Sequence, residues 1–200
     1  MFDTQLRSLV ERPLKVVAFR LVRAGLSADC LTLSGALIAL GAAAAILGDH
    51  LPLALALIVA SRIFDGLDGA VARVNGPTAW GGYLDSLADY VFYISIPVAF
   101  GLAHPENLVP ALLLVASFTI TAVSFLAFAA IAALQPSTIN GPESKAFIYS
   151  IGLMEGSETI GFFVLFCLFP EYFGTLAFTF AALCLLTVVQ RVWLASKKFP

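Results

Sequence analysis

The chain has 200 residues, of which 60% are hydrophobic and only 12% are charged. A soluble domain carries roughly twice that share of charge, and a domain of this size has too little interior to bury so much apolar surface. The composition therefore predicts an integral membrane protein. The net charge of -2 excludes the strongly basic surface of a nucleic-acid-binding protein, and three widely spaced cysteines do not make a disulfide framework.

The first 24 residues combine basic and apolar side chains at helical spacing. The basic residues are Arg7, Arg12, Lys15, Arg20 and Arg23, and they are interleaved with Leu6, Val10, Leu14, Val17 and Leu21. This pattern is typical of an amphipathic helix that lies along a membrane surface. A cleaved signal peptide would need an uninterrupted apolar core and a small-residue cleavage site, which this stretch lacks. We therefore predict a juxtamembrane helix over residues 1–24 and a membrane domain over residues 25–200.

Six apolar runs of spanning length follow, separated by short breaks that carry Pro, Gly or charged residues. They cover residues 29–48, 52–74, 80–102, 108–134, 146–169 and 173–195. Each approaches the ~20 residues that a helix needs to cross the hydrocarbon core of a bilayer. Because lipid cannot satisfy backbone polar groups, such runs are expected to be helical. The predicted fold is an all-α membrane protein with six transmembrane helices after the amphipathic helix, and six spans place both termini on one side.

The basic residues indicate which side that is. The connections at residues 48–51, 104–107 and 170–173 contain no Lys or Arg, whereas the N-terminal segment, Lys145 and the C-terminal end carry most of these residues. By the positive-inside rule, both termini face the cytoplasm. No organelle-targeting segment is visible, so the expected location is a bacterial inner membrane.

Four aspartates interrupt the apolar pattern of the second and third runs. Asp65 and Asp68 are three residues apart and Asp85 and Asp89 are four apart, so each pair shares one helix face. The short link at residues 75–78 makes these helices an antiparallel hairpin, which lets all four carboxylates converge. Such a cluster is expensive within a membrane, and divalent cations are its natural partners. Oxygen-only ligands favour a hard ion, Mg²⁺ or Mn²⁺.

Residues around the aspartates admit two interpretations. Gly66, Gly69, Gly76, Gly81 and Gly82 gather near the acids. Glycines there allow a ligand or backbone to approach closely, but small residues also allow membrane helices to pack tightly. Arg62 lies three residues before Asp65 on the same face, so we expect it to balance the acidic charge rather than to contact a substrate. A purely structural network of salt bridges is disfavoured, because two arginines cannot neutralise four aspartates.

The region from residue 65 to residue 89 resembles the signature of the CDP-alcohol phosphatidyltransferases, membrane enzymes of phospholipid synthesis. The pattern is D-x-x-D-G-x-x-A-R, then seven residues, then G-x-x-x-D-x-x-x-D. Its eight positions are occupied by Asp65, Asp68, Gly69, Ala72, Arg73, Gly81, Asp85 and Asp89. The signature spans only 25 residues, but the six-helix plan with an amphipathic N-terminal helix is similar to the family over most of the chain.

This resemblance implies an activity and roles for the aspartates. The family transfers a substituted phosphate from a CDP-linked donor to an alcohol, releases CMP and uses two divalent ions. The implied metal ligands are Asp65, Asp68, Asp85 and Asp89, with Asp89 near the second ion and acting as the base toward the acceptor hydroxyl. Two ions suit this chemistry, because they can stabilise the attacking and leaving oxygens together.

The resemblance also implies a binding site for the CDP group of the donor. The implied residues are Asp29, Thr32, Gly69, Ala72, Arg73 and Gly81. Arg73 would contact the phosphates or the cytidine, and Gly69 and Ala72 would keep that wall thin. The family usually has a proline where this chain has Ala28 at the start of its first spanning helix. From the sequence alone, Thr32 is equally well a plain helix-start hydroxyl.

The acceptor is less clearly indicated. Lys145, Glu155, Glu158 and Arg191 are charges that the apolar pattern leaves unexplained, and the family places acceptor contacts on these later helices. Lys145 and Arg191 would suit an acceptor with a phosphate, such as glycerol 3-phosphate or an inositol phosphate, whereas the glutamates would suit an amine or hydroxyls. The alternatives are positive-inside anchors for the basic pair and ion pairs for the glutamates.

The sequence-based hypothesis is therefore transfer of a phosphatidyl group from CDP-diacylglycerol to a polar alcohol, by a protein expected to be a homodimer as its relatives commonly are. Some relatives instead join CDP-choline or CDP-ethanolamine to diacylglycerol, and that direction is an alternative. Two alternatives of other classes are a divalent-cation transporter and an inert lipid-binding subunit. The outer halves of the helices lack the polar path that a transporter needs, and an inert protein need not keep Asp89.

Overall fold

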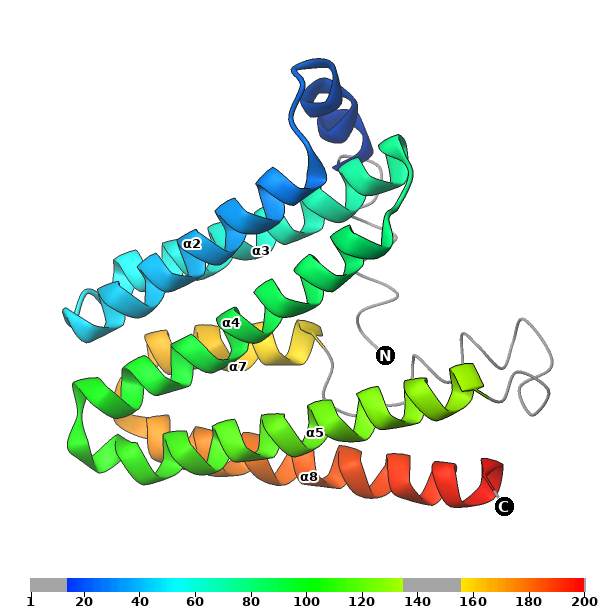
Figure 1. The fold of residues 1–200 in the computed structure, drawn as a ribbon. Coiled ribbons are helices and arrows are strands. Elements are labelled where there is room, and N and C mark those ends of the chain that lie inside the picture. Colours follow the sequence, from blue (N-terminus) through cyan, green and yellow to red (C-terminus); the bar gives the residue numbers. More distant parts are fainter. Residues whose placement is uncertain (1–13, 135–155, 200) are drawn as a thin grey trace.

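The computed structural model describes residues 14–134 and 156–199, and this part of the chain is helical without any strand (Figure 1). Residues 14–23 form a short helix ahead of the long ones. The long helices are α2 (Ala28–Leu47), α3 (Leu51–Asn75), α4 (Ala79–Ala103), α5 (Leu108–Leu134), α7 (Gly156–Leu168) and α8 (Phe173–Lys198). Two 3₁₀ turns, η1 (Pro105–Asn107) and η3 (Pro170–Tyr172), lead into α5 and α8.

The predicted spans agree in position with these helices where the structure describes them, and residues 146–155 of the fifth predicted span lie outside the described residues. Within the described residues, α2, α4, η1 with α5, and η3 with α8 are long and apolar enough to cross a membrane. Helix α3 has 25 residues but carries the charged cluster, and α7 has 13 residues in the described part, so neither meets the same criterion. The protein thus has the helices of an integral membrane protein, and the count of six spans stays a prediction.

The helices form two pairs that are joined through α4 and α7. Helix α2 packs along α3 and α4, and α5 packs along α8. Helix α4 also contacts α5, and α7 contacts both α3 and α8, so the two pairs become one bundle. In Figure 1 the end of α3, the start of α4 and the ends of α5 and α8 lie at the same side of the bundle. The acidic residues of α3 and α4 belong to this side.

Helices α2 and α3 pack closely against each other. Between α2 and α3, small residues allow a tight approach: a methyl group built on Gly35 would lie 3.3 Å from Cβ of Phe64. The Ser61 hydroxyl also donates a hydrogen bond of 2.9 Å to the carbonyl oxygen of Gly35. Close small-residue contacts of this kind are a common way for membrane helices to associate. They hold the start of α2 beside the acidic end of α3.

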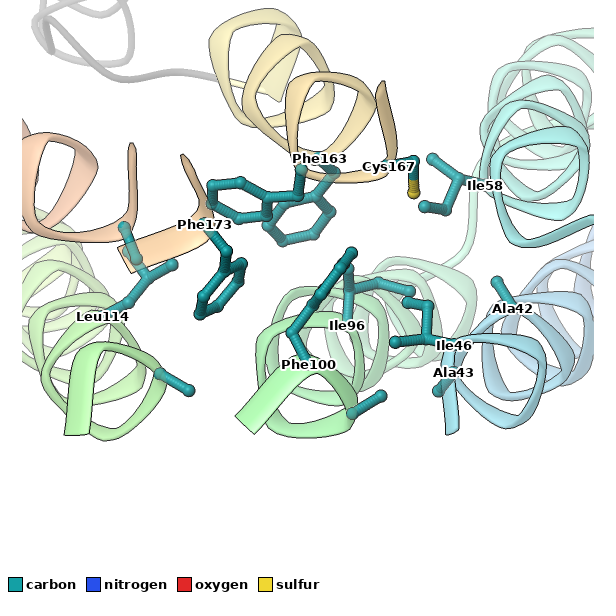
Figure 2. Packing of buried hydrophobic residues seen from close by; sticks show 14 of the residues in the cluster. Ala42, Ala43, Ile46, Ile58, Ile96, Phe100, Leu114, Phe163, Cys167 and Phe173 are labelled. Carbon is teal, nitrogen blue, oxygen red and sulfur yellow. The ribbon is translucent and has the colours of Figure 1, made fainter. Parts of the chain in front are cut away.

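A phenylalanine core fills the space between α4, α5, α7 and α8. Six phenylalanines are almost completely buried, namely Phe92, Phe100, Phe163, Phe166, Phe173 and Phe180. The ring centroids of Phe100 and Phe173 lie 4.8 Å apart, and Figure 2 shows these rings beside Phe163 of α7. Offset and edge-to-face ring contacts add to the dispersion energy of this packing. Since Phe92 and Phe100 lie on α4 after Asp89, the core fixes the helix that carries two of the aspartates.

The N-terminal helix covers the acidic end of α3. Ala18 is fully buried, and Leu14 packs against a small cluster formed by Leu31, Ala70 and Val71. Lys15 and the two arginines of this helix are exposed. The basic side chains thus lie on the outside, but Val16 and Phe19 are exposed as well, so the amphipathic helix over residues 1–24 stays a prediction. Residues 1–13 lie outside the described residues.

Candidate metal and nucleotide site

The link between α3 and α4 is a tight turn with a capped helix start. Gly76 has a φ of 94°, a backbone conformation that favours glycine. Thr78 is the N-cap of α4, and its hydroxyl accepts a hydrogen bond of 2.9 Å from the backbone N–H of Gly81. This local chemistry ends α3, starts α4 and turns the acidic faces of the two helices toward each other.

Three of the four signature aspartates meet in one cluster. One carboxylate oxygen each from Asp65, Asp85 and Asp89 can be chosen so that all three atoms lie within 4.8 Å of one another. All three residues are half-buried. We call this group the carboxylate cluster. Three carboxylate oxygens at this separation match the ligand chemistry of a hard divalent cation, so the residues fit the Mg²⁺ or Mn²⁺ that the sequence predicts.

Asp68, the fourth signature aspartate, does not belong to that group. Its side chain is buried, with 4% of its surface exposed, and Oδ2 accepts a hydrogen bond of 2.6 Å from the hydroxyl of Thr32. The contact joins α3 to the start of α2. For Thr32 the family resemblance implied a nucleotide contact, with a plain helix-start hydroxyl as the alternative. The structure adds a contact that sequence reasoning missed, because Thr32 hydrogen-bonds a predicted metal ligand.

Arg62 supplies positive charge to the carboxylate cluster. Its Nη1 lies 2.7 Å from Oδ1 of Asp89 and 3.4 Å from Oδ1 of Asp65. The guanidinium carbon stands 3.8 Å from the ring centroid of Phe92, a cation–π contact. The prediction that Arg62 balances the acids is therefore confirmed by two ion pairs.

A cavity of about 430 Å³ opens beside the carboxylate cluster. It lies where the start of α2, the end of α3 and the start of α4 come together, and we call it the first cavity. All six residues that the sequence predicted for the CDP group line it: Asp29, Thr32, Gly69, Ala72, Arg73 and Gly81. Asp68 and Asp85 line it as well, so predicted metal ligands and predicted nucleotide residues share one hollow. Its lining includes Ser27, the N-cap of α2, which sequence reasoning missed.

Two of the glycines leave room that a side chain would take. A methyl group built on Gly81 would lie 3.1 Å from Oγ1 of Thr78 and 3.5 Å from Oδ1 of Asp29. One built on Gly69 would lie 3.3 Å from Nη1 of Arg73. Both glycines therefore permit a polar side chain to approach the cavity wall. Gly66 is different, because its nearest neighbour is the side chain of Leu14, a packing contact.

A second cavity of about 310 Å³ lies between α4, α5, α7 and α8. Its lining combines aromatic rings with hydroxyls and one guanidinium, and includes Tyr90, Tyr93, Thr121, Thr159 and Arg191. Nη1 of Arg191 donates hydrogen bonds of 2.9 Å to the carbonyl oxygen of Thr121 and 3.3 Å to Oγ of Ser124. The side chain of Arg191 is therefore held against α5, inside the bundle.

The acceptor residues predicted from the sequence divide into three groups. Arg191 lines the second cavity. Glu158 lies in the first turn of α7, where its carboxylate accepts a hydrogen bond of 3.0 Å from the hydroxyl of Ser157, and it is not part of the lining. Lys145 and Glu155 lie outside the described residues. The tyrosines and threonines of this cavity carry no motif and were not predicted.

One face of α4 connects the two cavities. Asp85, Asp89 and Tyr93 follow one another at intervals of four residues, which places them on the same face of the helix. Asp85 lines the first cavity, Asp89 belongs to the carboxylate cluster, and Tyr93 lines the second cavity. One face of α4 thus runs from the first cavity, past the carboxylate cluster, to the second cavity.

A family comparison decides what kind of protein carries this arrangement. The sequence model of the CDP-alcohol phosphatidyltransferase family matches residues 26–195. The chain belongs to that family. It is therefore a member of a transferase family of phospholipid biosynthesis, and the resemblance found in the signature extends over the whole membrane domain.

Individual relatives of this phosphatidyltransferase support the assignment. The chain is 43% identical over 195 residues to the inner membrane protein YnjF of Escherichia coli K12, covering 96% of this chain and 94% of YnjF. It is also 43% identical over 86 residues to the archaetidylinositol phosphate synthase of Methanothermobacter thermautotrophicus, which covers 42% of this chain and 43% of the synthase.

Solved structures show the same fold. The phosphatidylinositol phosphate synthase PgsA1 of Mycobacterium tuberculosis, crystallised with CDP-DAG bound, superposes with a TM-score of 0.64 at 22% identity, covering 90% of this chain and 92% of PgsA1. A second crystal structure of PgsA1, in complex with manganese and citrate, gives a TM-score of 0.63 at 20% identity, covering 90% and 87% of the two chains. The phosphatidyltransferase described here shares their helical architecture.

Proposed function

We propose that this phosphatidyltransferase moves a phosphatidyl group from CDP-diacylglycerol to a polar alcohol and releases CMP. The observation that carries the proposal is the placement of the carboxylate cluster against a cavity lined by all six residues expected to bind the CDP group. The CDP-DAG bound to PgsA1 and the names of the two synthases among the relatives favour a lipid-linked donor.

The carboxylates present fit the divalent metal that this reaction needs. Asp65, Asp85 and Asp89 would hold it, with Asp68 as the fourth ligand that the signature implies. Two ions of Mg²⁺ or Mn²⁺ would neutralise the diphosphate of the donor and stabilise the leaving phosphate of CMP. PgsA1, which has the same fold, was crystallised with manganese.

The residues of the first cavity would bind the nucleotide end of the donor. Arg73 can pair with a phosphate of the diphosphate, because its guanidinium carries a fixed charge and several donors. Gly69 and Gly81 keep the wall low enough for the nucleotide to reach Arg73 and Asp29. Thr32 holds Asp68 by the 2.6 Å hydrogen bond and stands at the same wall.

Asp89 would act as the general base. The acceptor hydroxyl gives its proton to the carboxylate of Asp89, and its oxygen forms a new bond to the phosphorus that carries the diacylglycerol. The bond between that phosphorus and the bridging oxygen of the diphosphate breaks, and CMP leaves with this oxygen. The position of Asp89, between the residues that line the two cavities, suits a proton acceptor that must reach a hydroxyl bound on the far side.

The second cavity would hold the acceptor. Arg191 folds into the bundle and donates to backbone and hydroxyl oxygens, which is not the conformation of an arginine that only anchors a helix at the membrane surface. A guanidinium among tyrosines and threonines suits an acceptor that combines hydroxyls with an anionic group. We therefore place a phosphate-bearing alcohol, such as an inositol phosphate or glycerol 3-phosphate, first among the candidates.

The location follows from the helices and the relatives. Within residues 14–134 and 156–199, four helical segments are long and apolar enough to cross a membrane. The relative that matches nearly the whole chain is an inner membrane protein of a bacterium. We place this protein in a bacterial inner membrane with both termini and the aspartates on the cytoplasmic side, as a homodimer. Labelling of single cysteines introduced in the η1 and η3 turns of intact cells would test the orientation, since both turns would face the periplasm.

Release of CMP by the purified protein in detergent tests the reaction. The assay combines CDP-diacylglycerol with Mg²⁺ or Mn²⁺ and runs across inositol phosphate, glycerol 3-phosphate, inositol, serine, choline and phosphatidylglycerol. We expect release that requires both the metal and one acceptor. Asp89→Asn should abolish it, and Glu106→Gln, which changes an exposed acid in the η1 turn, should leave it intact.

The same assay separates the alternatives. If labelled CDP-choline or CDP-ethanolamine acts as donor toward diacylglycerol while CDP-diacylglycerol does not, the proposed direction is wrong. If no CDP compound is consumed and no donor binds, the protein is not a transferase. Metal flux into sealed vesicles without turnover would instead indicate a transporter.

A further inference from the structure

Arg62 lies outside the eight-position signature but makes the ion pairs that the structure shows at the carboxylate cluster. Its side chain is 11% exposed, so this charge is nearly withdrawn from water. A buried charge of this kind is retained at a cost in desolvation free energy. The signature assigns no role to Arg62, so its burial beside the aspartates needs a separate explanation.

Contacts hold the guanidinium in one place from several sides. Nη1 bridges Asp89 and Asp65, Nη2 donates a hydrogen bond of 3.2 Å to Oγ of Ser61, and the plane of the group lies by the ring of Phe92. Ser61 is itself fixed by its hydrogen bond to the carbonyl oxygen of Gly35. Nε is buried and has no hydrogen-bond partner. The polar contacts of the side chain are thus made by its two terminal nitrogens, Nη1 and Nη2.

The charges around Arg62 place it in competition with a divalent cation. One guanidinium offsets one of the three negative charges of the carboxylate cluster, and a divalent ion bound by the same oxygens would be repelled by the guanidinium. A guanidinium in direct contact with the ligand oxygens repels a cation bound by the same oxygens, and a partly buried pair of charges is screened less than an exposed one. Removal of the guanidinium should therefore change metal affinity measurably.

We propose that Arg62 is a positioning residue that holds Asp89 through Oδ1 and keeps the carboxylate cluster assembled before metal and donor bind. This inference rests on the proposed function, since it assumes that Asp65 and Asp89 bind the metal. Arg62 opposes metal binding to the free enzyme and, by fixing Asp89, supports turnover. The two effects have opposite signs, which distinguishes this role from that of a residue needed only for folding.

Manganese binding to the full chain in detergent, without nucleotide, tests the inference. Arg62→Gln removes the charge, and Arg23→Gln, which removes an exposed charge from the N-terminal helix, is the matched control. We expect Arg62→Gln to bind Mn²⁺ roughly 5-fold more tightly or better. Its kcat for CMP release at saturating Mn²⁺ should fall at least tenfold with little change in the KM for CDP-diacylglycerol. Arg62→Lys, which keeps the charge, should keep the wild-type Mn²⁺ affinity and recover part of the kcat.

Thermal unfolding supplies a second readout. In EDTA, Arg62→Gln should melt below the wild type, and Mn²⁺ should raise its melting temperature by more than it raises that of the wild type. If Arg62→Gln does not fold in EDTA, the double variant Arg62→Gln with Asp89→Asn, which restores the net charge of the cluster, should fold and approach the wild-type melting temperature. Failure of the double variant to recover would overturn the inference.

The remaining outcomes separate this inference from the proposed function. Unchanged or weaker Mn²⁺ affinity in a folded Arg62→Gln protein would show that Arg62 serves only the fold. A wild-type protein that binds no Mn²⁺ and releases no CMP would instead refute the proposed function itself. The result for Arg62→Gln would therefore refute the role of Arg62 alone, whereas the result for the wild type would refute the metal-dependent reaction.

Discussion

The first and second cavities flank the same carboxylate cluster but are built in different ways. The first takes its lining from three adjoining helix ends and consists largely of glycines, aspartates and one arginine close together in sequence. The second takes its lining from four helices and combines tyrosines, threonines and Arg191 across a hundred residues of chain. The residues of the shared chemical step can form a short sequence motif because they lie on adjoining helix ends. The shape and polarity of the second cavity can instead change with a substitution on any of its four helices.

This difference predicts two classes of substitution. Some should reduce the transfer rate to the same extent with every acceptor, and others should change only the KM for the acceptor. Residues of the carboxylate cluster and the first cavity should act on the donor and on the transfer itself. Residues of the second cavity should act on the KM for the acceptor and leave donor binding unchanged. The predictions below test this division in order of decreasing effect.

Loss of Asp89, the proposed general base, should have the largest effect. We expect Asp89→Asn to reduce kcat by roughly 10³-fold with every acceptor, because the hydroxyl then has no group to accept its proton. Binding of CDP-diacylglycerol, measured directly by equilibrium binding, should survive. A kcat that stays within a few-fold of the wild type would remove Asp89 from this role, and Glu106→Gln provides the control for loss of an acidic side chain elsewhere.

Loss of a ligand that also lines the first cavity should affect donor binding as well. We expect Asp68→Asn to reduce turnover roughly 10²-fold and to weaken metal-dependent binding of CDP-diacylglycerol. The variant would hold the metal less tightly, and the positive charge of the metal would neutralise the diphosphate of the donor. The measurement is donor binding with Mn²⁺ and with EDTA, compared with Asp89→Asn. Equal donor binding in the two variants would contradict the separate roles given to these aspartates.

Arg191 offers the sharpest test of the second cavity. We expect Arg191→Gln to raise the KM for an anionic acceptor by roughly 10- to 100-fold, the value of a lost charge-assisted hydrogen bond. The KM for CDP-diacylglycerol should not change. Lys197→Gln, which removes an exposed charge near the end of the same helix, is the control. A change in the KM for the donor, without a change in the KM for the acceptor, would contradict the assignment of Arg191 to acceptor binding.

A methyl group in the first cavity should have the smallest effect. We expect Gly69→Ala to raise the KM for CDP-diacylglycerol by roughly 5- to 10-fold, since the new Cβ would lie 3.3 Å from Nη1 of Arg73 and shift this guanidinium. Gly161→Ala is the matched control, because a methyl group there meets no atom within 4 Å. Steady-state kinetics in donor and in acceptor measure both constants, and an effect on the acceptor KM alone would contradict the assignment.

Much of the first cavity could be predicted from the sequence because its determinants are local. The spacing of Asp65, Asp85 and Asp89 places them on facing sides of one hairpin, and the structure brings their oxygens together. The contact of Arg62 with Asp65 also follows from helical spacing, whereas its shorter contact with Asp89 depends on how α4 packs beside α3. Thr32 was placed near the nucleotide, but its hydrogen bond to Asp68 depends on how closely α2 packs on α3, which spacing within one helix does not determine.

The second cavity could be predicted only in part. Arg191 was recognised as a charge that the apolar pattern does not explain, and it lines the cavity. Tyr90, Tyr93 and Thr159 read as ordinary residues of apolar helices, because their convergence depends on the packing of α4, α5, α7 and α8. A tyrosine or threonine in a membrane helix gives no signal of its own until its neighbours from other helices are known.

Mass spectrometry of the lipids after one reaction, with CMP quantified in the same sample, distinguishes transfer from hydrolysis. We expect CDP-diacylglycerol to be converted to a phosphodiester of the acceptor with one CMP released per product lipid, and we expect Asp89→Asn to form neither product. Release of CMP with phosphatidic acid as the only lipid product would mean hydrolysis rather than transfer. Product formation by Asp89→Asn at the wild-type rate would contradict the site described here.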